Sequence, residues 1–186
     1  IAVDVKRLND LVRALPDKQS LDFTLEANGN LLVKSGRSRF RLPTRPAADY
    51  PRMTPAKEQR VTLAIGAKRL AQLLEQVAEA VAVADIRSYL NGALVSLGNG
   101  FLTLVGTDGF RMVVARHPIA GTENMAAKSV ILPRKTALLA RRLLVQGGEV
   151  KLSLGSSDLQ IAFDDGTIIF GKSLEGQFPA WERAIP

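Results

Sequence analysis

The chain has 186 residues, 46% of them hydrophobic, which is enough to bury a sizeable core. It has no cysteine, which excludes disulfide scaffolds and thiolate metal sites and fits a reducing, cytoplasmic location. Lysine and arginine total 25 against 18 acidic residues, and this net charge of +7 indicates an anionic partner such as nucleic acid. No apolar run reaches the length of a membrane span, so we expect no membrane partner.

Three segments begin alike, with a short predicted strand and then a helix that opens with two basic residues. These openings are residues 1–8, 63–70 and 130–135. In the first two helices the apolar residues recur at i, i+3, i+4 and i+7, the spacing of one buried stripe. The predicted stripes are Leu8, Leu11, Val12 and Leu15 in the first helix, Leu70, Leu73, Leu74 and Val77 in the second, and Leu139 and Leu143 in the third.

The first and third segments correspond at a constant offset of 128 residues, which pairs Leu31 with Leu159 and Tyr50 with Phe178. Their apolar residues keep the same alternation, so the strand faces are preserved. We therefore predict a half-domain at residues 1–57, with its other half expected before Ile1, and a complete domain at residues 58–186. The polar, proline-containing stretch 53–60 is the predicted linker.

Alternating apolar residues predict strands at residues 21–25, 150–154 and 159–163. Residues 28–30 and 164–166 have turn chemistry. Residues 101–107 and 110–115 predict a hairpin closed by a two-residue turn at Asp108-Gly109, because Asp-Gly favours positive φ angles. The fold class is therefore α+β, with repeated half-domain units in which helices pack on antiparallel sheets.

Basic residues at a helix start are mildly unfavourable, because the helix N-terminus already carries partial positive charge. Because all three helices open with two basic residues, we expect their starts to face an external anion. Nucleic-acid phosphates suit this role, because basic side chains contact them whatever the base sequence. The alternative is that long basic side chains lie over apolar surface at helix ends. The residues concerned are Lys6, Arg7, Lys68, Arg69, Arg134 and Lys135, and Arg141 and Arg142 extend the third helix's basic face.

A second basic cluster, Arg37, Arg39 and Arg41, is better interpreted as a solvated edge strand. No catalytic constellation is present, because the single histidine, His117, has no nucleophile partner and the phosphate-loop and nucleophile-elbow motifs are missing. Asp164 and Asp165 stand before Gly166 in a predicted turn, without companion carboxylates. We therefore expect no catalytic residue, no metal and no cofactor.

The chain resembles the bacterial DNA polymerase III beta subunits, the sliding clamps, over its whole length. The motifs that carry the resemblance, in order, are residues 35–40, 42–44, 46–51, 89–92, 106–111, 132–135 and 176–179. The resemblance implies a non-catalytic processivity factor. In its full-length form, two three-domain subunits make a homodimeric ring around double-stranded DNA, with helices lining the hole and sheets outside. The DNA polymerase III alpha subunit, clamp-loader subunits and other clamp-binding-motif proteins are the implied partners.

The resemblance also implies a pocket for short linear peptides between the second and third domains. Many family members have His at the position of Phe110 and Leu at that of Met112, so the pocket here is expected to be more apolar. The implied residues of the second-domain wall are Leu90, Thr107, Gly109, Phe110, Arg111, Met112, Pro179, Arg183 and Ala184.

DNA contacts implied by the resemblance fall on Lys6, Ser88 and Tyr89, although an aromatic residue can occupy the position of Ser88 in the family. Arg87, Arg134, Lys135, Arg141 and Arg142 are added from charge and helix position. Because the chain lacks a third domain, we expect that it cannot close a ring alone. Two other functions stay open: a module that binds nucleic acid directly through phosphates, and an enzyme that uses Asp164 or Asp165.

Overall fold

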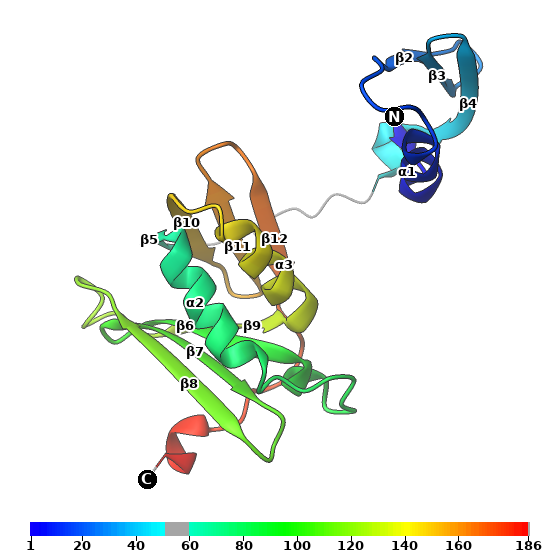
Figure 1. The fold of residues 1–186 in the computed structure, drawn as a ribbon. Helices are drawn as coiled ribbons and strands as arrows, with labels where there is room; N and C mark the ends of the chain where they lie inside the picture. The colour runs from blue at the N-terminus through cyan, green and yellow to red at the C-terminus, as the bar shows by residue number, and fades with distance from the viewer. Residues whose placement is uncertain (51–59, 186) are drawn as a thin grey trace. The chain divides into compact units, whose positions relative to one another are not determined.

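The computed structural model describes residues 1–50 and 60–185. The chain divides into unit 1, Ile1–Met53, and unit 2, Thr54–Pro186. The predicted linker lies, apart from Arg60, outside the described residues. Both units combine helices with antiparallel sheets, as predicted (Figure 1). In the described part of the chain, no helix is long and apolar enough to cross a membrane.

Unit 1 is one helix on one four-stranded antiparallel sheet of order β1-β4-β3-β2. Helix α1 contributes Leu8 and Leu11 to a small core, but Val12 of the predicted stripe is 40% exposed, so that part of the prediction is wrong. The buried sheet residues of this core are Leu31, Val33 and Leu42. The elements are β1 (Ala2–Val3), α1 (Val5–Arg13), β2 (Asp22–Leu25), β3 (Asn30–Ser35), β4 (Ser38–Arg45) and the 3-10 helix η1 (Ala47–Asp49).

Unit 2 contains two four-stranded antiparallel sheets, of order β12-β11-β10-β5 and β8-β7-β6-β9. Its first half is β5 (Val61–Gly66), α2 (Ala67–Ala78), η2 (Ser88–Asn91), β6 (Gly92–Gly98), β7 (Phe101–Thr107) and β8 (Met112–Pro118). Its second half is β9 (Lys128–Pro133), α3 (Arg134–Leu144), β10 (Glu149–Leu154), β11 (Asp158–Phe163), β12 (Ile168–Lys172) and η3 (Trp181–Ala184).

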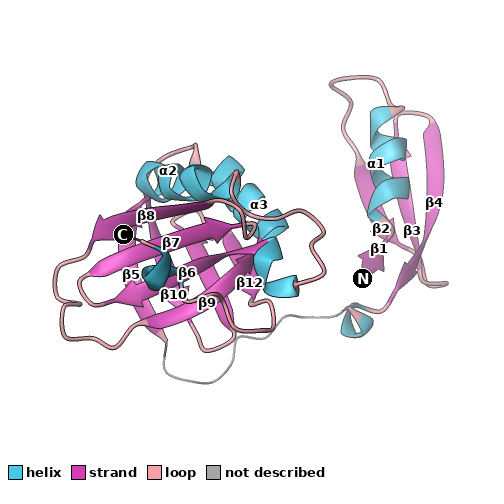
Figure 2. Ribbon diagram, turned by 90° about the horizontal axis from the view of Figure 1, so that it is seen from below, coloured by secondary structure: helices cyan, strands magenta, loops and turns pink. Residues whose placement is uncertain are grey.

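The two halves of unit 2 exchange their first strands. Strand β5 pairs with β10 of the second half, and β9 pairs with β6 of the first half. Helices α2 and α3 lie side by side over the sheets (Figure 2). One core joins both sheets and both helices, so neither half can bury its apolar surface without the other.

The repeat predicted from the sequence is visible in the elements themselves. Strands β3 and β11 begin and end 128 residues apart. The chain turns at residues 27–29 and 164–166, and the carboxylate of Asp165 accepts a hydrogen bond from the backbone N–H of Thr167 at 2.8 Å. The first turn thus lies one residue before its predicted position, and Asn30 begins β3.

The stripe prediction is confirmed for α2, whose Leu70, Leu73, Leu74 and Val77 are buried. For α3 it is confirmed for Leu143, which is partly buried against the core, and wrong for Leu139, which is 51% exposed. The buried residues of α3 are Ala137, Ala140 and Leu144, which recur at i, i+3 and i+7 along one face. Two alanines there give the core less bulk than leucines would.

The β7–β8 hairpin differs from the prediction in its turn. Thr107 pairs directly with Met112, so the connection has four residues, Asp108 to Arg111, instead of two. Only Gly109 among them has a positive φ angle, +91°, whereas the predicted turn type needs positive φ at both central residues. The longer loop is what places Phe110 and Arg111 outside the sheet.

Gly106, the first glycine of the motif at residues 106–111, is required by a close backbone approach. A Cβ atom at this position would overlap the carbonyl oxygen of Val77 at the end of α2. Replacing Gly106 by alanine must therefore shift either strand or helix. We expect Gly106→Ala to lower the free energy of unfolding by about 1–3 kcal/mol.

Urea denaturation followed by circular dichroism measures this effect. Gly66→Ser is the matched control, because Gly66 has φ −58° at the α2 start, no atom lies within 4 Å of its would-be Cβ, and serine is a favoured helix cap. We expect the control to change stability by no more than about 0.5 kcal/mol. Equal losses of stability in the two variants would contradict the explanation.

Candidate DNA interface and peptide-binding wall

Helices α2 and α3 form a basic layer. Within their bounds they carry six basic residues and one acidic residue, Glu75. The two helices are antiparallel. Lys68, at the start of α2, lines the same surface hollow as Val145, just past the end of α3. Glu75, farther along α2, pairs with Arg141 at 3.4 Å. The two basic helix starts of unit 2 therefore lie at opposite ends of one layer.

Several of the predicted DNA-contacting residues are already engaged within the protein. The Nε–H of Arg69 donates to Nδ1 of His117 on β8 at 3.3 Å, which turns Arg69 toward the sheet. Arg141 makes the ion pair with Glu75. The Nε atom of Arg134 is buried and has no hydrogen-bond partner among the described residues. Arg69 and Arg141 are thus less available to an external phosphate.

The remaining cations of the layer, Lys68, Lys135 and Arg142, are exposed. None of them makes an ion pair within residues 1–50 and 60–185. They are the groups that the fold leaves available to an anion.

In unit 1, Lys6 and Arg7 are exposed in the first turn of α1. The helix is capped by the carboxylate of Asp4, which accepts a hydrogen bond from the backbone N–H of Arg7 at 2.9 Å. This bond is the main reason that the pKa of Asp4 is lowered. The capping carboxylate offsets the unfavourable meeting of two basic side chains with the helix dipole.

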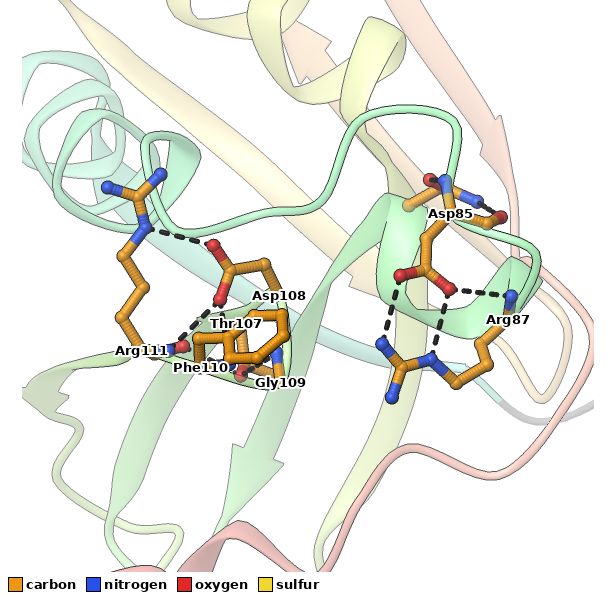
Figure 3. A network of polar contacts seen from close by, with 8 residues as sticks. Asp85, Arg87, Thr107, Asp108, Gly109, Phe110 and Arg111 are labelled. Atoms are coloured by element: carbon orange, nitrogen blue, oxygen red, sulfur yellow. Dashed lines mark hydrogen bonds and ion pairs between the residues drawn. The ribbon is translucent and has the colours of Figure 1, made fainter.

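A second candidate site begins at the loop before β6, where Asp85 holds Arg87 (Figure 3). The Asp85 carboxylate accepts from the Arg87 backbone N–H at 2.8 Å and from Nε at 3.0 Å, and pairs with Nη2 at 2.9 Å. The side-chain hydrogen bond from Arg87 is the main cause that lowers the pKa of Asp85 to about 2. Charge alone predicts Arg87 as a DNA contact, but its positive charge is largely compensated here.

Arg87 instead packs against the β7–β8 loop. A Cβ atom at Gly109 would lie 3.3 Å from Nη2 of Arg87, and the φ of +91° at this position favours glycine. This approach brings the loop around Asp85 beside the loop at residues 108–111. Both loops present a large apolar side chain to solvent, with Ile86 99% and Phe110 96% exposed.

The β7–β8 loop is fixed by its own hydrogen bonds. The buried hydroxyl of Thr107 donates to the carbonyl of Arg111 at 2.8 Å and accepts from the N–H of Gly109 at 3.1 Å. The Asp108 carboxylate accepts from the backbone N–H groups of Phe110 and Arg111 at 2.9 and 3.0 Å, and from Arg111 Nε at 3.0 Å. These bonds, first that from Phe110, lower the pKa of Asp108. The exposed Phe110 ring therefore stands on a rigid base.

The C-terminal segment, residues 174–184, covers the outer face of the sheet β8-β7-β6-β9. Trp181 is buried against Leu94, Val105 and Ile131. Partly buried residues around this apolar cluster are Tyr89, Met112, Val114, Leu174 and Phe178. The segment thereby brings Pro179, Arg183 and Ala184 to the sheet face that carries Met112.

The predicted wall residues thus differ in accessibility. Phe110, Arg111, Pro179, Arg183 and Ala184 are exposed, Met112 is half-buried, and Leu90 is only 1% exposed, so Leu90 has the environment of a core residue. Ser88 is exposed, but its hydroxyl donates to the carbonyl of Glu175 at 3.1 Å, and Tyr89 packs beside Gly176. Arg87 and Trp181 were not predicted as parts of this wall, although the chain's single tryptophan was a signal available in the sequence.

Two further features bear on function. A cavity of about 550 Å³ opens beneath the C-terminal segment, lined among others by Leu94, Ile131 and Trp181, and of the predicted wall residues it includes Pro179 alone. In the described part of the chain, no cluster of three or more histidine or acidic side chains could hold a metal ion.

Comparison with known proteins identifies the fold and the family. Residues 64–180 match the family model for the central domain of the DNA polymerase III beta subunit, and residues 1–54 match that for its N-terminal domain. The beta sliding clamp of Pseudomonas aeruginosa is 36% identical over 187 residues, which cover 100% of this chain and 50% of that protein. The beta sliding clamp of Escherichia coli K12 is 33% identical, over 99% of this chain and 49% of that protein.

Solved structures agree. The crystal structure of the P. aeruginosa DNA polymerase III beta subunit superposes with a TM-score of 0.86 at 34% identity, covering 99% of this chain and 50% of that one. A P. aeruginosa sliding clamp bound to griselimycin gives a TM-score of 0.85 at 35% identity, over 99% and 49% of the two chains. The chain spans about half the length of the curated relatives it matches. With both family models matched in order, the chain belongs to the family of DNA polymerase III beta subunits.

Proposed function

We propose that this chain serves as part of a non-catalytic sliding clamp, which in a homodimeric ring encircles double-stranded DNA without reading its sequence and tethers replication proteins. The observation that carries the proposal is the match to two clamp domains in order along one chain. In this proposal residues 1–57 are the second half of the clamp's first domain and residues 58–186 its middle domain. The setting is the cytoplasm, where the replicating DNA lies.

The DNA side of the proposal rests on the basic layer of α2 and α3. Phosphate contacts need cations that are exposed and not compensated by carboxylates, and Lys68, Lys135 and Arg142 meet both conditions in unit 2. Lys6 and Arg7 add to this set in unit 1. Arg69, Arg134 and Arg141 add positive charge to the same layer. Ser88 and Tyr89 remain proposed contacts, although the Ser88 hydroxyl already donates to the carbonyl of Glu175.

The partner side of the proposal rests on the wall made by the β7–β8 loop and the C-terminal segment. Its rigid backbone, its exposed Phe110 ring and the half-buried Met112 suit a short peptide that inserts apolar side chains. The DNA polymerase III alpha subunit, clamp-loader subunits and other clamp-binding proteins are the proposed donors of such peptides. Arg87, held by Asp85 beside Gly109, belongs to this wall in the proposal and not to the DNA-binding set.

The DNA interface predicts a specific charge dependence. In Lys135→Ala/Arg142→Ala, a fluorescently labelled duplex should bind more weakly, because fewer phosphates are neutralised by the protein. The slope of log affinity against log salt should fall by about 0.9 for each phosphate that the variant no longer neutralises. Fluorescence anisotropy across a salt series measures both the affinity and the slope.

The charge-matched control is Lys151→Ala/Lys172→Ala, which removes two exposed lysines from the sheet β12-β11-β10-β5. Equal effects of the two double variants would contradict a localised interface. Weak duplex binding by the 186-residue chain is expected for a clamp that relies on encirclement, whereas tight, steeply salt-dependent binding would favour a direct nucleic-acid-binding module.

The peptide wall predicts that Gly109→Ala weakens binding of griselimycin, the compound named as bound to a P. aeruginosa clamp. The added methyl strains a backbone with φ +91° and displaces Arg87, so we expect the dissociation constant to rise at least about fivefold. Isothermal titration calorimetry gives the constants. Gly29→Ala imposes similar strain at φ +81° in unit 1, and weaker binding in this control too would contradict the assignment.

The Asp85–Arg87 pair predicts a carboxyl group that titrates far below its ordinary range. Carbon-13 NMR should place the midpoint of Asp85 at about 2, and Arg87→Gln should move it back toward 3.8. Because the folded pKa is depressed, the pair's stabilisation is complete above pH 3.8 and is lost as the pH falls toward 2. A midpoint near 3.8 in the parent chain would show that the pair does not form in solution.

A further inference from the structure

The last turn of the chain, η3, is attached to the sheet mainly by side chains. The main-chain hydrogen bonds formed by residues 177–185 of the described chain are internal, such as Trp181 N–H to Pro179 O at 2.7 Å and Arg183 N–H to Ala180 O at 3.2 Å. The preceding residue with a main-chain bond to the sheet is Leu174, which donates to Ile131 O at 2.9 Å. The position of η3 therefore depends on what holds Trp181.

Arg116 on β8 also contacts Trp181, from the same strand that contributes Met112 and Val114 to the apolar cluster. Its guanidinium carbon lies 5.1 Å from the centroid of the Trp181 ring and 5.7 Å from that of Phe101, so one cation faces two aromatic rings. Both distances are within the range of a cation–π interaction. Arg116 is exposed and makes no ion pair with any described residue, so no carboxylate competes with the rings for its charge.

We propose that Arg116 is a positioning residue, which holds Trp181 against β8 and so fixes η3, with Arg183 and Ala184, beside Met112. A planar guanidinium can lie over one ring while meeting a second, whereas a lysine ammonium acts as a point charge and an uncharged side chain has no such attraction. For the peptide wall this inference rests on the proposed function. For the placement of η3 it rests only on the contacts of Arg116.

The chain's single tryptophan makes the contact directly measurable. Arg116→Met keeps an unbranched stem but removes the charge, and Arg116→Lys keeps the charge but not the plane. In Arg116→Met we expect a red-shifted Trp181 emission, weaker protection from acrylamide quenching, and faster amide hydrogen exchange at Arg183 and Ala184. Arg116→Lys should restore part of each change. Lys151→Met, which removes an exposed charge from β10, should leave all three unchanged.

Urea unfolding followed by far-ultraviolet circular dichroism should give all variants the same core transition, since Arg116 lies outside the main core. Unchanged emission, quenching and exchange in Arg116→Met would overturn the proposal, and so would equal changes in Lys151→Met.

Griselimycin titration separates this inference from the proposed function. We expect the dissociation constant to rise about three- to fivefold in Arg116→Met and less in Arg116→Lys. If the parent chain does not bind griselimycin at all, the wall of this chain is not sufficient for binding on its own, while emission and amide exchange still decide the role of Arg116. If η3 loosens in Arg116→Met and griselimycin affinity stays the same, Arg116 positions the turn but not the wall.

Discussion

The exchange of first strands in unit 2 is the constraint on which its other features depend. Strand β5 completes the sheet of the second half and β9 that of the first, so the start of each helix is tied to the opposite sheet. Helices α2 and α3 must then lie side by side over both sheets, which is where their basic residues meet. Gly106 lets the end of α2 approach β7 closely, and the resulting core joins both halves. The arrangement gives one buried interior and two chemically different surfaces.

The two surfaces lie on opposite sides of unit 2, one on the helices and the other on the outer face of a sheet. The inner faces pack against the helices, and the outer side of the helices carries cations with few carboxylates. The outer face of the sheet β8-β7-β6-β9 is covered by the C-terminal segment and edged by the rigid β7–β8 loop. In the proposed function, DNA and an apolar peptide would therefore contact different side chains of one small domain.

Sequence reasoning found the elements whose signal is local and repeated. The stripe of α2 could be predicted because four bulky residues share one face, whereas the inner face of α3 is made largely of alanines, which carry a weak hydrophobic signal. The four-residue loop was missed because an Asp-Gly pair is also typical of a two-residue turn. Here the Asp108 carboxylate instead accepts hydrogen bonds from the backbone N–H groups of Phe110 and Arg111. Arg69 and Arg87 could not be assigned from charge alone, since their partners, His117 and Asp85, are set by packing.

The bond between Arg69 and His117 engages the chain's only imidazole. The guanidinium donates to Nδ1 at 3.3 Å, so this edge of the imidazole faces helix α2 and not solvent. The contact ties β8, an edge strand of its sheet, to the start of α2 through two side chains. A basic residue at a helix start can therefore serve to anchor the helix to the sheet below it.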